Sequence, residues 1–221
     1  MDFSVLQTSP LFAGISGEDI RKLSACLAPE RKTYDKKDAI FLAGDKVSAV
    51  GIVAKGAIQV VSEDFLGNRS ILARLTEGDL FAESFACADA GVIPVSVYAV
   101  EPSEVYFIDC RRILTTCSSC VYHARLIANM MRILAGKNVR LSQKIEILSK
   151  RSIRDKLITY LSAQALQVGS RSFAIPFNRQ ELADFLGVDR SALSKELSNM
   201  QKEGLLSYDK NRFRLSGGLM E

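Results

Sequence analysis

The chain has 221 residues and a mass of 24.3 kDa, with 48% apolar and 24% charged residues. This balance excludes an intrinsically disordered chain, a collagen and a disulfide-dense miniprotein. No uncharged, apolar run reaches the roughly 18 residues that a membrane-spanning helix needs, and no basic stretch precedes an apolar core at the N-terminus. We therefore expect a cytoplasmic protein with no membrane partner.

The formal net charge of +4 is unevenly distributed along the chain. Residues 1–149 carry 17 basic and 17 acidic side chains, whereas residues 150–221 carry 12 and 8. The whole excess of positive charge lies in the last third of the chain. This distribution is expected if that third binds a polyanion such as DNA.

The first 120 residues are predicted to be mostly β structure. A helix capped at Ser16 and ending near Leu27 comes first. Glycines then recur at positions 44, 56, 67 and 78, with short segments rich in Val, Ile, Ala and Phe between them. Short strands separated by turn residues at this spacing are typical of a sandwich or barrel. The predicted strands are Val50–Ala54, Ala57–Ser62, Ser70–Leu75, Val92–Val100 and Glu104–Asp109.

Residues 121–150 predict one long helix, because they contain no Pro and a single Gly. Apolar residues recur every seven positions, with a second row four positions further on, which is typical of a helix paired with another helix. About 45 Å of helix is more than a small domain needs internally, so a dimer helix is favoured over a core helix. The predicted dimer interface consists of Ile127, Met131, Leu134, Asn138, Leu141, Ile145 and Leu148.

Residues 151–177 predict a further helix and a short strand. Ser152 is a predicted N-terminal cap, and the helix that it begins ends near Gly169. The segment Phe173–Phe177 is predicted to be a strand with Pro176 near its end.

The next 25 residues predict a helix-turn-helix motif. Asn178 and Glu181 have the spacing of a capping box, which begins a helix that ends at Leu186. Gly187 supplies the left-handed conformation of a tight turn, and Asp189 caps a second helix. Two helices joined by so short a turn form the motif that places its second helix in the DNA major groove.

The exposed face of the second helix carries the functional signal. Its N-terminal end is rich in Arg, Lys and Ser, which donate hydrogen bonds to base edges. A predicted hairpin, or wing, follows and carries basic residues that reach phosphate. The alternative is an ordinary solvated helix face. The predicted DNA-binding residues are Arg179, Gln180, Arg190, Ser191, Ser194, Lys195, Lys210 and Arg212.

Three stretches carry a family resemblance: GDKVSAVGIVAKGAIQVV, EGDLFAESF and NRQELADFLGVDRSALSKELSNMQKEGLL. With them the chain resembles the Crp–Fnr family of bacterial transcription regulators. The resemblance implies an α+β fold: a jelly-roll (double-stranded β-helix), cyclic-nucleotide-binding-like domain at 1–120, a dimerisation helix at 121–150 and a winged helix-turn-helix at 151–221. It also implies a homodimer that binds a palindromic double-stranded DNA operator, and contact with RNA polymerase if the protein is an activator.

The resemblance also predicts where an effector would bind. Members of the family that bind cyclic AMP use a Glu on the ribose and an Arg on the cyclic phosphate. Glu83 matches the Glu, but residues 92–95, where the Arg belongs, hold no basic side chain. We therefore do not expect cyclic AMP as the effector, and the missing cation leaves open whether an unidentified small molecule binds instead. The predicted effector pocket consists of Phe81, Ala82, Glu83, Ser84, Ile93, Pro94 and Val95.

The cysteines leave three interpretations open. Cys110, Cys117 and Cys120 could form a redox site through a disulfide between Cys117 and Cys120. They could instead ligate an iron–sulfur cluster with Cys87 or Cys26 as the fourth ligand, or simply be buried apolar residues. No other metal site and no further cofactor are predicted.

An enzyme is not predicted. The chain contains neither a Gly-x-Ser-x-Gly nucleophile elbow nor a P-loop, and it has a single His. An alternative of a different class is a nucleotide-binding regulatory subunit that acts on a protein partner. Such a subunit would share the barrel but not the C-terminal helix-turn-helix.

Overall fold

The computed structural model describes residues 4–63, 69–115 and 122–216, and the chain divides into two compact units, residues 1–136 and 137–221. The first unit begins with two 3₁₀ turns, η1 (Ser4–Thr8) and η2 (Pro10–Phe12), and helix α1 (Gly17–Leu27). The predicted cap of α1 is confirmed, since the hydroxyl oxygen of Ser16 accepts the backbone N–H of Asp19 at 3.2 Å.

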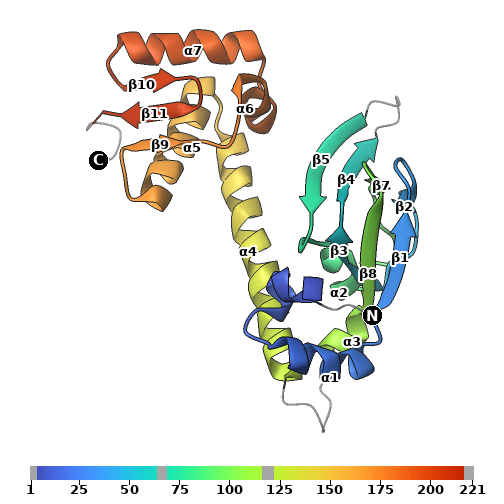
Figure 1. Ribbon diagram of the computed structural model, residues 1–221. Helices are drawn as coiled ribbons and strands as arrows, with labels where there is room; N and C mark the ends of the chain where they lie inside the picture. The colour runs from blue at the N-terminus through green and yellow to red at the C-terminus, as the bar shows by residue number, and fades with distance from the viewer. Residues whose placement is uncertain (1–3, 64–68, 116–121, 217–221) are drawn as a thin grey trace. The chain divides into compact units, whose positions relative to one another are not determined.

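Two four-stranded antiparallel sheets form the body of the first unit (Figure 1). One has the order β1-β8-β3-β6 and the other the order β2-β7-β4-β5. Branched apolar side chains from β3 and β8 are fully buried in the core of this unit, which is why their Val- and Ile-rich composition was a strand signal. The predicted jelly roll is confirmed. Its strands are β1 (Glu30–Tyr34), β2 (Ala39–Phe41), β3 (Ala49–Lys55), β4 (Ala57–Glu63), β5 (Arg69–Thr76), β6 (Leu80–Phe81), β7 (Ser96–Ala99) and β8 (Ser103–Asp109).

The predicted strand Val92–Val100 was too long, since β7 covers only Ser96–Ala99. Before β7, the backbone N–H of Ile93 donates to the carbonyl of Asp45 at 2.9 Å. The next residue, Pro94, has no N–H to donate to a neighbouring strand. These two features divert the chain into a loop before the sheet begins.

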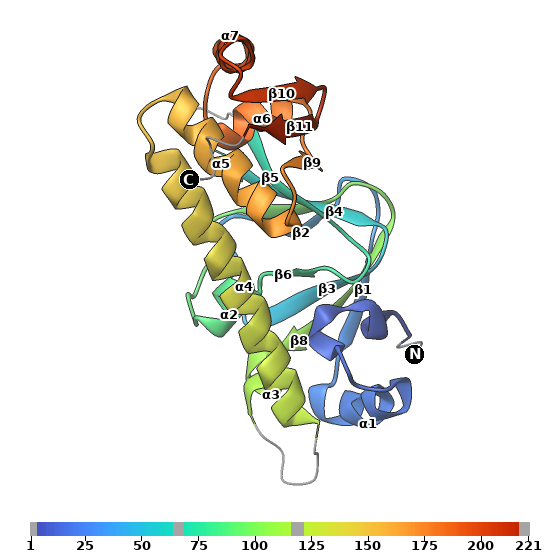
Figure 2. The ribbon, with the colours of Figure 1, turned by 90° about the vertical axis from the view of Figure 1, so that its left-hand side faces the viewer.

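Three helices complete the first unit: α2 (Glu83–Cys87), α3 (Cys110–Leu114) and the first part of α4 (His123–Ser149). Leu126 and Met130 of α4 are fully buried in the same core as the sheets. Helices α1 and α3 lie around this N-terminal end of α4 (Figures 1 and 2). The predicted long helix is confirmed as α4.

The second unit has its own core, to which the last turn of α4 contributes Ile147. Its three-stranded sheet has the order β10-β11-β9. The predicted strand Phe173–Phe177 was also too long, because the N–H of Ile175 donates to Asn211 outside the ladder and Pro176 follows. The elements are α5 (Ile153–Val168), β9 (Ser172–Ala174), α6 (Arg179–Leu186), α7 (Arg190–Lys202), β10 (Leu206–Asp209) and β11 (Arg212–Leu215).

Candidate DNA-binding surface

Helix α6 is fixed at both ends by the residues that predicted it. The side chain of Asn178 accepts the backbone N–H of Glu181 at 3.0 Å, and the carboxylate of Glu181 accepts the N–H of Asn178 at 2.7 Å. Gly187 ends the helix in the left-handed region, with φ at +61°. A side chain at this position would be strained, so the tight turn into α7 depends on glycine.

Helix α7 is held by a cap and a fully buried face. The carboxylate of Asp189 accepts the N–H groups of Ser191 at 2.8 Å and Ala192 at 2.9 Å. One face of α7 packs against the core of the second unit, where Leu193 and Leu197 are fully buried. Burial of this face sets which side of α7 is presented to solvent.

The predicted recognition residues at the start of α7 lie on its free side. Arg190, Ser191 and Lys195 are exposed, and Ser194 is half-buried. The hydroxyl of Ser191 donates to the Asp189 carboxylate, which lowers the pKa of that carboxyl group. Because the side chains of Arg190 and Lys195 are exposed near the N-terminus of α7, they can bind an anion at the positive end of the helix dipole.

Two predicted residues of α6 are engaged within the protein. The side-chain amide of Gln180 donates to Asp184 at 2.8 Å. The guanidinium of Arg179 lies over the ring of Tyr208 at 4.8 Å and donates to the carbonyl of Lys210 at 3.4 Å. Burial lowers the pKa of Arg179. Its contacts join α6 to the hairpin of β10 and β11.

The hairpin presents the remaining predicted basic residues. Its turn places Lys210 in the left-handed region, with φ at +52°, and both Lys210 and Arg212 are exposed. Arg214 is a third exposed basic side chain of this hairpin that the sequence analysis did not include. Alternating burial along β11, with Phe213 and Leu215 inside, is the signal that places the arginines outside.

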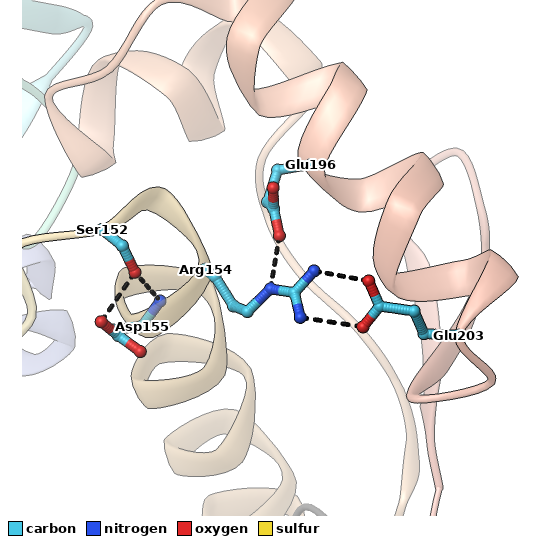
Figure 3. A network of polar contacts seen from close by, with 5 residues as sticks. All are labelled: Ser152, Arg154, Asp155, Glu196 and Glu203. Carbon is cyan, nitrogen blue, oxygen red and sulfur yellow. Dashed lines mark hydrogen bonds and ion pairs between the residues drawn. The ribbon is translucent and has the colours of Figure 1, made fainter.

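A charged contact that the sequence analysis missed holds α7 against α5 (Figure 3). The guanidinium of Arg154 donates through Nη1 and Nη2 to the carboxylate of Glu203 at 2.8 and 2.7 Å, and through Nε to Glu196 at 2.6 Å. These bonds raise the pKa of Arg154 and lower the pKa of Glu203. The planar guanidinium group of an arginine is suited to donating two parallel hydrogen bonds to one carboxylate, as Arg154 does to Glu203. Glu196 lies in α7 and Glu203 caps its C-terminus, and their seven-residue spacing was the available signal.

The helix α4 carries the predicted dimer interface. Met131, Leu141 and Ile145 are 59–61% exposed and Leu148 is 39% exposed, while Asn138 is also exposed. Leu134 instead packs partly against the core of the first unit, and Ile127 is half-buried. Much of the predicted seam is thus an apolar row open to solvent within a single chain.

The predicted effector pocket lies around the start of α2. Phe81 is buried, and its ring contacts Phe41 and Phe107 edge to face at centroid distances of 6.2 and 6.1 Å. Glu83 is only 2% exposed and its carboxylate accepts the hydroxyl of Ser84 at 3.2 Å. The other predicted residues range from buried to exposed: Ala82 and Ile93 are buried, Val95 is half-buried, and Ser84 and Pro94 are exposed.

The cysteine predictions fall partly outside the described residues. Cys117 and Cys120 lie there, whereas Cys110 is buried at the start of α3. The sulfur of Cys110 lies 2.7 Å from the sulfur of Cys87, a pair that the sequence analysis did not single out. Among residues 4–63, 69–115 and 122–216, no three His, Cys, Asp or Glu side chains group as a metal site requires. Within the same residues, no helix combines the length and apolarity needed to cross a membrane.

Known protein families match both units. The family model described as a cyclic nucleotide-binding domain matches residues 31–120, and the model described as a Crp-like helix-turn-helix domain matches residues 155–216. Together they cover most of the chain and confirm the resemblance drawn from the sequence.

Curated relatives match along nearly the whole chain. The cyclic AMP receptor protein of Thermus thermophilus is 25% identical over 202 residues, which are 91% of this chain and 89% of that protein. The transcriptional activator protein FnrA of Stutzerimonas stutzeri is 25% identical over 84% of this chain and 80% of its own. The fumarate and nitrate reduction regulatory protein of Escherichia coli K12 is 26% identical over 80% and 71%. The second and third of these relatives are named as a transcriptional activator and a regulatory protein.

Solved structures share the fold. CprK complexed with OCPA superposes with a TM-score of 0.66 at 14% identity, covering 91% of this chain and 92% of that one. The c-di-GMP responsive global regulator CLP of Xanthomonas campestris gives a TM-score of 0.56 at 18% identity, covering 91% and 100%. At these identities the similarity concerns the architecture of the chain.

Proposed function

Because the chain belongs to the Crp–Fnr family of transcription regulators, we propose that two copies pair through α4 and bind a palindromic operator with their two α7 helices. The functional division that goes with this proposal is a sensor at residues 1–120, a dimerisation helix at 121–150 and a DNA-binding domain at 151–221. Such a protein works in the cytoplasm, where the chromosome lies, and contacts RNA polymerase if it activates.

The observation that carries the proposal is the free face at the start of α7. Arg190 and Lys195 are exposed there, next to a capped helix N-terminus whose buried face fixes its orientation. In a helix-turn-helix, this end of the second helix meets the base edges of the major groove. We assign base contacts to Arg190, Ser191, Ser194 and Lys195, and phosphate contacts to Lys210 and Arg212. Gln180 belongs to the same surface.

Arg179 takes a different part in the proposal. Its guanidinium stacks on Tyr208 and donates to the backbone of Lys210. Through these contacts it holds the wing beside α6, and its positive charge adds to the field that attracts DNA. We therefore treat Arg179 as a residue that positions Lys210 rather than as a base-reading residue.

Pairing through α4 follows from its exposed apolar row. Soluble proteins rarely leave such a row uncovered along one helix face, and heptad spacing matches the packing of two helices against each other. The row Met131, Leu141, Ile145 and Leu148 lies on the α4 surface that a second copy would cover. Ile127, Leu134 and Asn138 complete the proposed seam, with Asn138 available to fix its register.

Cyclic AMP is not the proposed effector, although one relative is named for it. No Lys or Arg occurs between Arg74 and Arg111, so the segment that follows Glu83 offers no cation to a buried phosphate. Charge-assisted hydrogen bonds of that kind contribute about 1.5–3 kcal/mol each. The match of residues 155–216 to a Crp-like helix-turn-helix also favours a DNA-binding regulator over a regulatory subunit for a protein partner.

The test is DNA binding by matched variants at opposite ends of α7. A duplex is first selected by the wild-type protein from a randomised pool. We expect Arg190→Ala and Lys195→Ala each to weaken binding to that duplex by about 1–3 kcal/mol, which is roughly 5- to 150-fold. Lys202→Ala removes the same charge about 18 Å away along the helix and should change binding by less than about threefold.

The measurement is a fluorescence anisotropy titration at several salt concentrations. Wild-type binding should fall steeply as salt rises, because bound phosphates release counterions. If no duplex is selected, or if Arg190→Ala, Lys195→Ala and Lys202→Ala bind equally well, the assigned surface is wrong.

A further inference from the structure

Two cysteine sulfurs lie side by side in the first unit, on helices that are far apart in the sequence. The Sγ atoms of Cys87, in α2, and Cys110, in α3, are 2.7 Å apart. Both residues carry free thiols. A disulfide requires a sulfur–sulfur distance of roughly 2.04 Å, so a small side-chain rotation would bring the two atoms to bonding distance. The helices that carry them already pack against each other.

The pair can be reached from solvent. A cavity of about 360 Å³ is lined by both cysteines together with Ser48, Asp89 and Arg111. Cys87 is half-buried and Cys110 is only 2% exposed. Cys87 is therefore the more accessible of the two thiols to a small oxidant that enters this cavity.

The two thiols differ in their chemistry. A hydrogen bond from Cys110 lowers the pKa of the Cys87 thiol, although burial and the nearby Glu83 oppose this shift. The same contact, together with burial, raises the pKa of Cys110. Cys87 is therefore the better nucleophile, since the thiolate is the reactive form, and Cys110 is the thiol held ready beside it.

We propose that Cys87 and Cys110 form an oxidant-sensing site, in which a hydroperoxide converts the two thiols to a disulfide that joins α2 to α3. The thiolate of Cys87 attacks one peroxide oxygen, the O–O bond breaks, and the leaving alkoxide or hydroxide takes up a proton. The thiol of Cys110 then attacks the resulting sulfenic acid, and water leaves. Two thiols and one hydroperoxide yield one disulfide, one alcohol (or water) and one water.

The disulfide between Cys87 and Cys110 would restrict how α2 can move relative to α3. Helix α2 begins at Glu83, in the predicted effector pocket, and α3 leads toward α4. A covalent link between α2 and α3 stabilises one arrangement of these helices over others. That oxidation changes DNA affinity rests on the proposed function, whereas formation of the bond does not.

The chain offers a clean chemical test, because trypsin separates the cysteines into three peptides. Residues 75–111 contain only Cys87 and Cys110, residues 113–125 contain Cys117 and Cys120, and residues 23–31 contain Cys26. Reduced full-length protein is treated with a small excess of hydrogen peroxide, quenched with catalase, alkylated with N-ethylmaleimide and digested. We expect peptide 75–111 to lose two hydrogens, take up no maleimide, and recover both reactive thiols after dithiothreitol.

Variants make the assignment specific. Cys87→Ser and Cys110→Ser should each abolish the two-hydrogen loss in peptide 75–111, and the matched control Cys26→Ser should leave it unchanged. Peptide 75–111 carrying two maleimides after peroxide would overturn the proposal. A cross-link from this peptide to residues 23–31 or 113–125 in the wild-type protein would overturn it as well.

A separate measurement tests whether oxidation of this site changes DNA affinity. Oxidation of wild-type protein should change its dissociation constant for the selected duplex by at least about fivefold, the lower end of typical allosteric coupling, and Cys110→Ser should not respond. A disulfide without any change in affinity would overturn the sensing role. Reduced protein that selects no duplex would contradict the proposed function, and the peptide map would still decide whether the site exists.

Discussion

At the scale of single residues, Gly51 shows how closely the first unit is packed. A Cβ atom at this position would lie 2.2 Å from Cζ of Phe81, which is far inside van der Waals contact. The ring cannot easily retreat, because Phe41 and Phe107 pack edge-on against it. The sequence analysis counted Phe81 among the predicted effector-pocket residues, but its ring belongs to the core of the first unit. Only the contact with Gly51, 30 positions earlier, reveals this.

We expect Gly51→Ala to destabilise the first unit by about 1–3 kcal/mol, because the added methyl group overpacks the core. Phe81→Leu removes the obstructing ring, so the double variant should lose less stability than the sum of the single changes. Urea unfolding gives the free energies, and amide hydrogen exchange in β3 assigns the loss to this unit.

A matched glycine provides the control for Gly51. Gly136 lies in the interior of α4, and nothing is found within 4 Å of a Cβ at that position. Gly136→Ala should therefore stabilise the helix by about 0.5–1 kcal/mol. Equal effects of Gly51→Ala and Gly136→Ala would contradict the steric argument.

At the scale of elements, the position of α7 depends on Arg154 as well as on its buried face. The ion pairs place α5 and α7 in one arrangement (Figure 3), and Lys156 adds a hydrogen bond to the carbonyl of Leu186 at the end of α6, at 3.0 Å. An arginine gives this two-point contact, whereas a lysine is a point charge. The orientation of the proposed reading helix is therefore set partly by charge.

This contact gives a pH dependence with a defined sign. The pKa of Glu203 is lowered by Arg154, so the stabilising contribution of the carboxylate is present above its unfolded pKa, near 4.3, and is lost as pH falls through the folded value. We expect Arg154→Gln to raise the pKa of Glu203 toward its ordinary value, as measured by carboxyl ¹³C NMR titration. The matched variant Lys156→Gln should leave it in place. An unshifted Glu203 in Arg154→Gln would mean that the ion pair is absent in solution.

An element could be predicted from the sequence when the residues that determine it are close neighbours along the chain. Local signals were sufficient for α6 and α7, because Asn178, Glu181, Gly187 and Asp189 act on neighbouring backbone. Strand ends near Pro94 and Pro176 were overestimated, since apolar composition continues past the point where a proline stops the ladder. The contact of Arg154 with Glu203 was missed, because the seven-residue spacing of Glu196 and Glu203 does not name the distant residue that they contact.

At the scale of the whole molecule, pairing through α4 is the step that would join two DNA-binding units into one dimer that binds a palindromic operator. Leu141 and Ile145 are both exposed and both lie in the proposed seam. Glutamate at either position would bury an unpaired charge between helices, which costs about 3–5 kcal/mol. Leu141→Glu and Ile145→Glu should each raise the dimer dissociation constant at least about a hundredfold.

Sedimentation velocity distinguishes the species, since a dimer has twice the 24.3 kDa mass of the chain. Gln143→Glu introduces the same charge on the same helix but outside the seam, and should remain dimeric. A wild-type protein that sediments as a monomer at every concentration, or a Gln143→Glu variant that dissociates as readily as Leu141→Glu, would argue against the seam.

The separation of the seam on α4 from the reading face on α7 has a genetic consequence. A chain altered only at Arg190 would keep every seam residue and so would still pair with an unaltered chain. In a cell that makes both in equal amounts, random pairing leaves about a quarter of the dimers with two intact reading helices, as two-fold assembly requires. Alleles of α7 would thus be dominant over the normal copy, whereas alleles that destroy the α4 seam would be recessive.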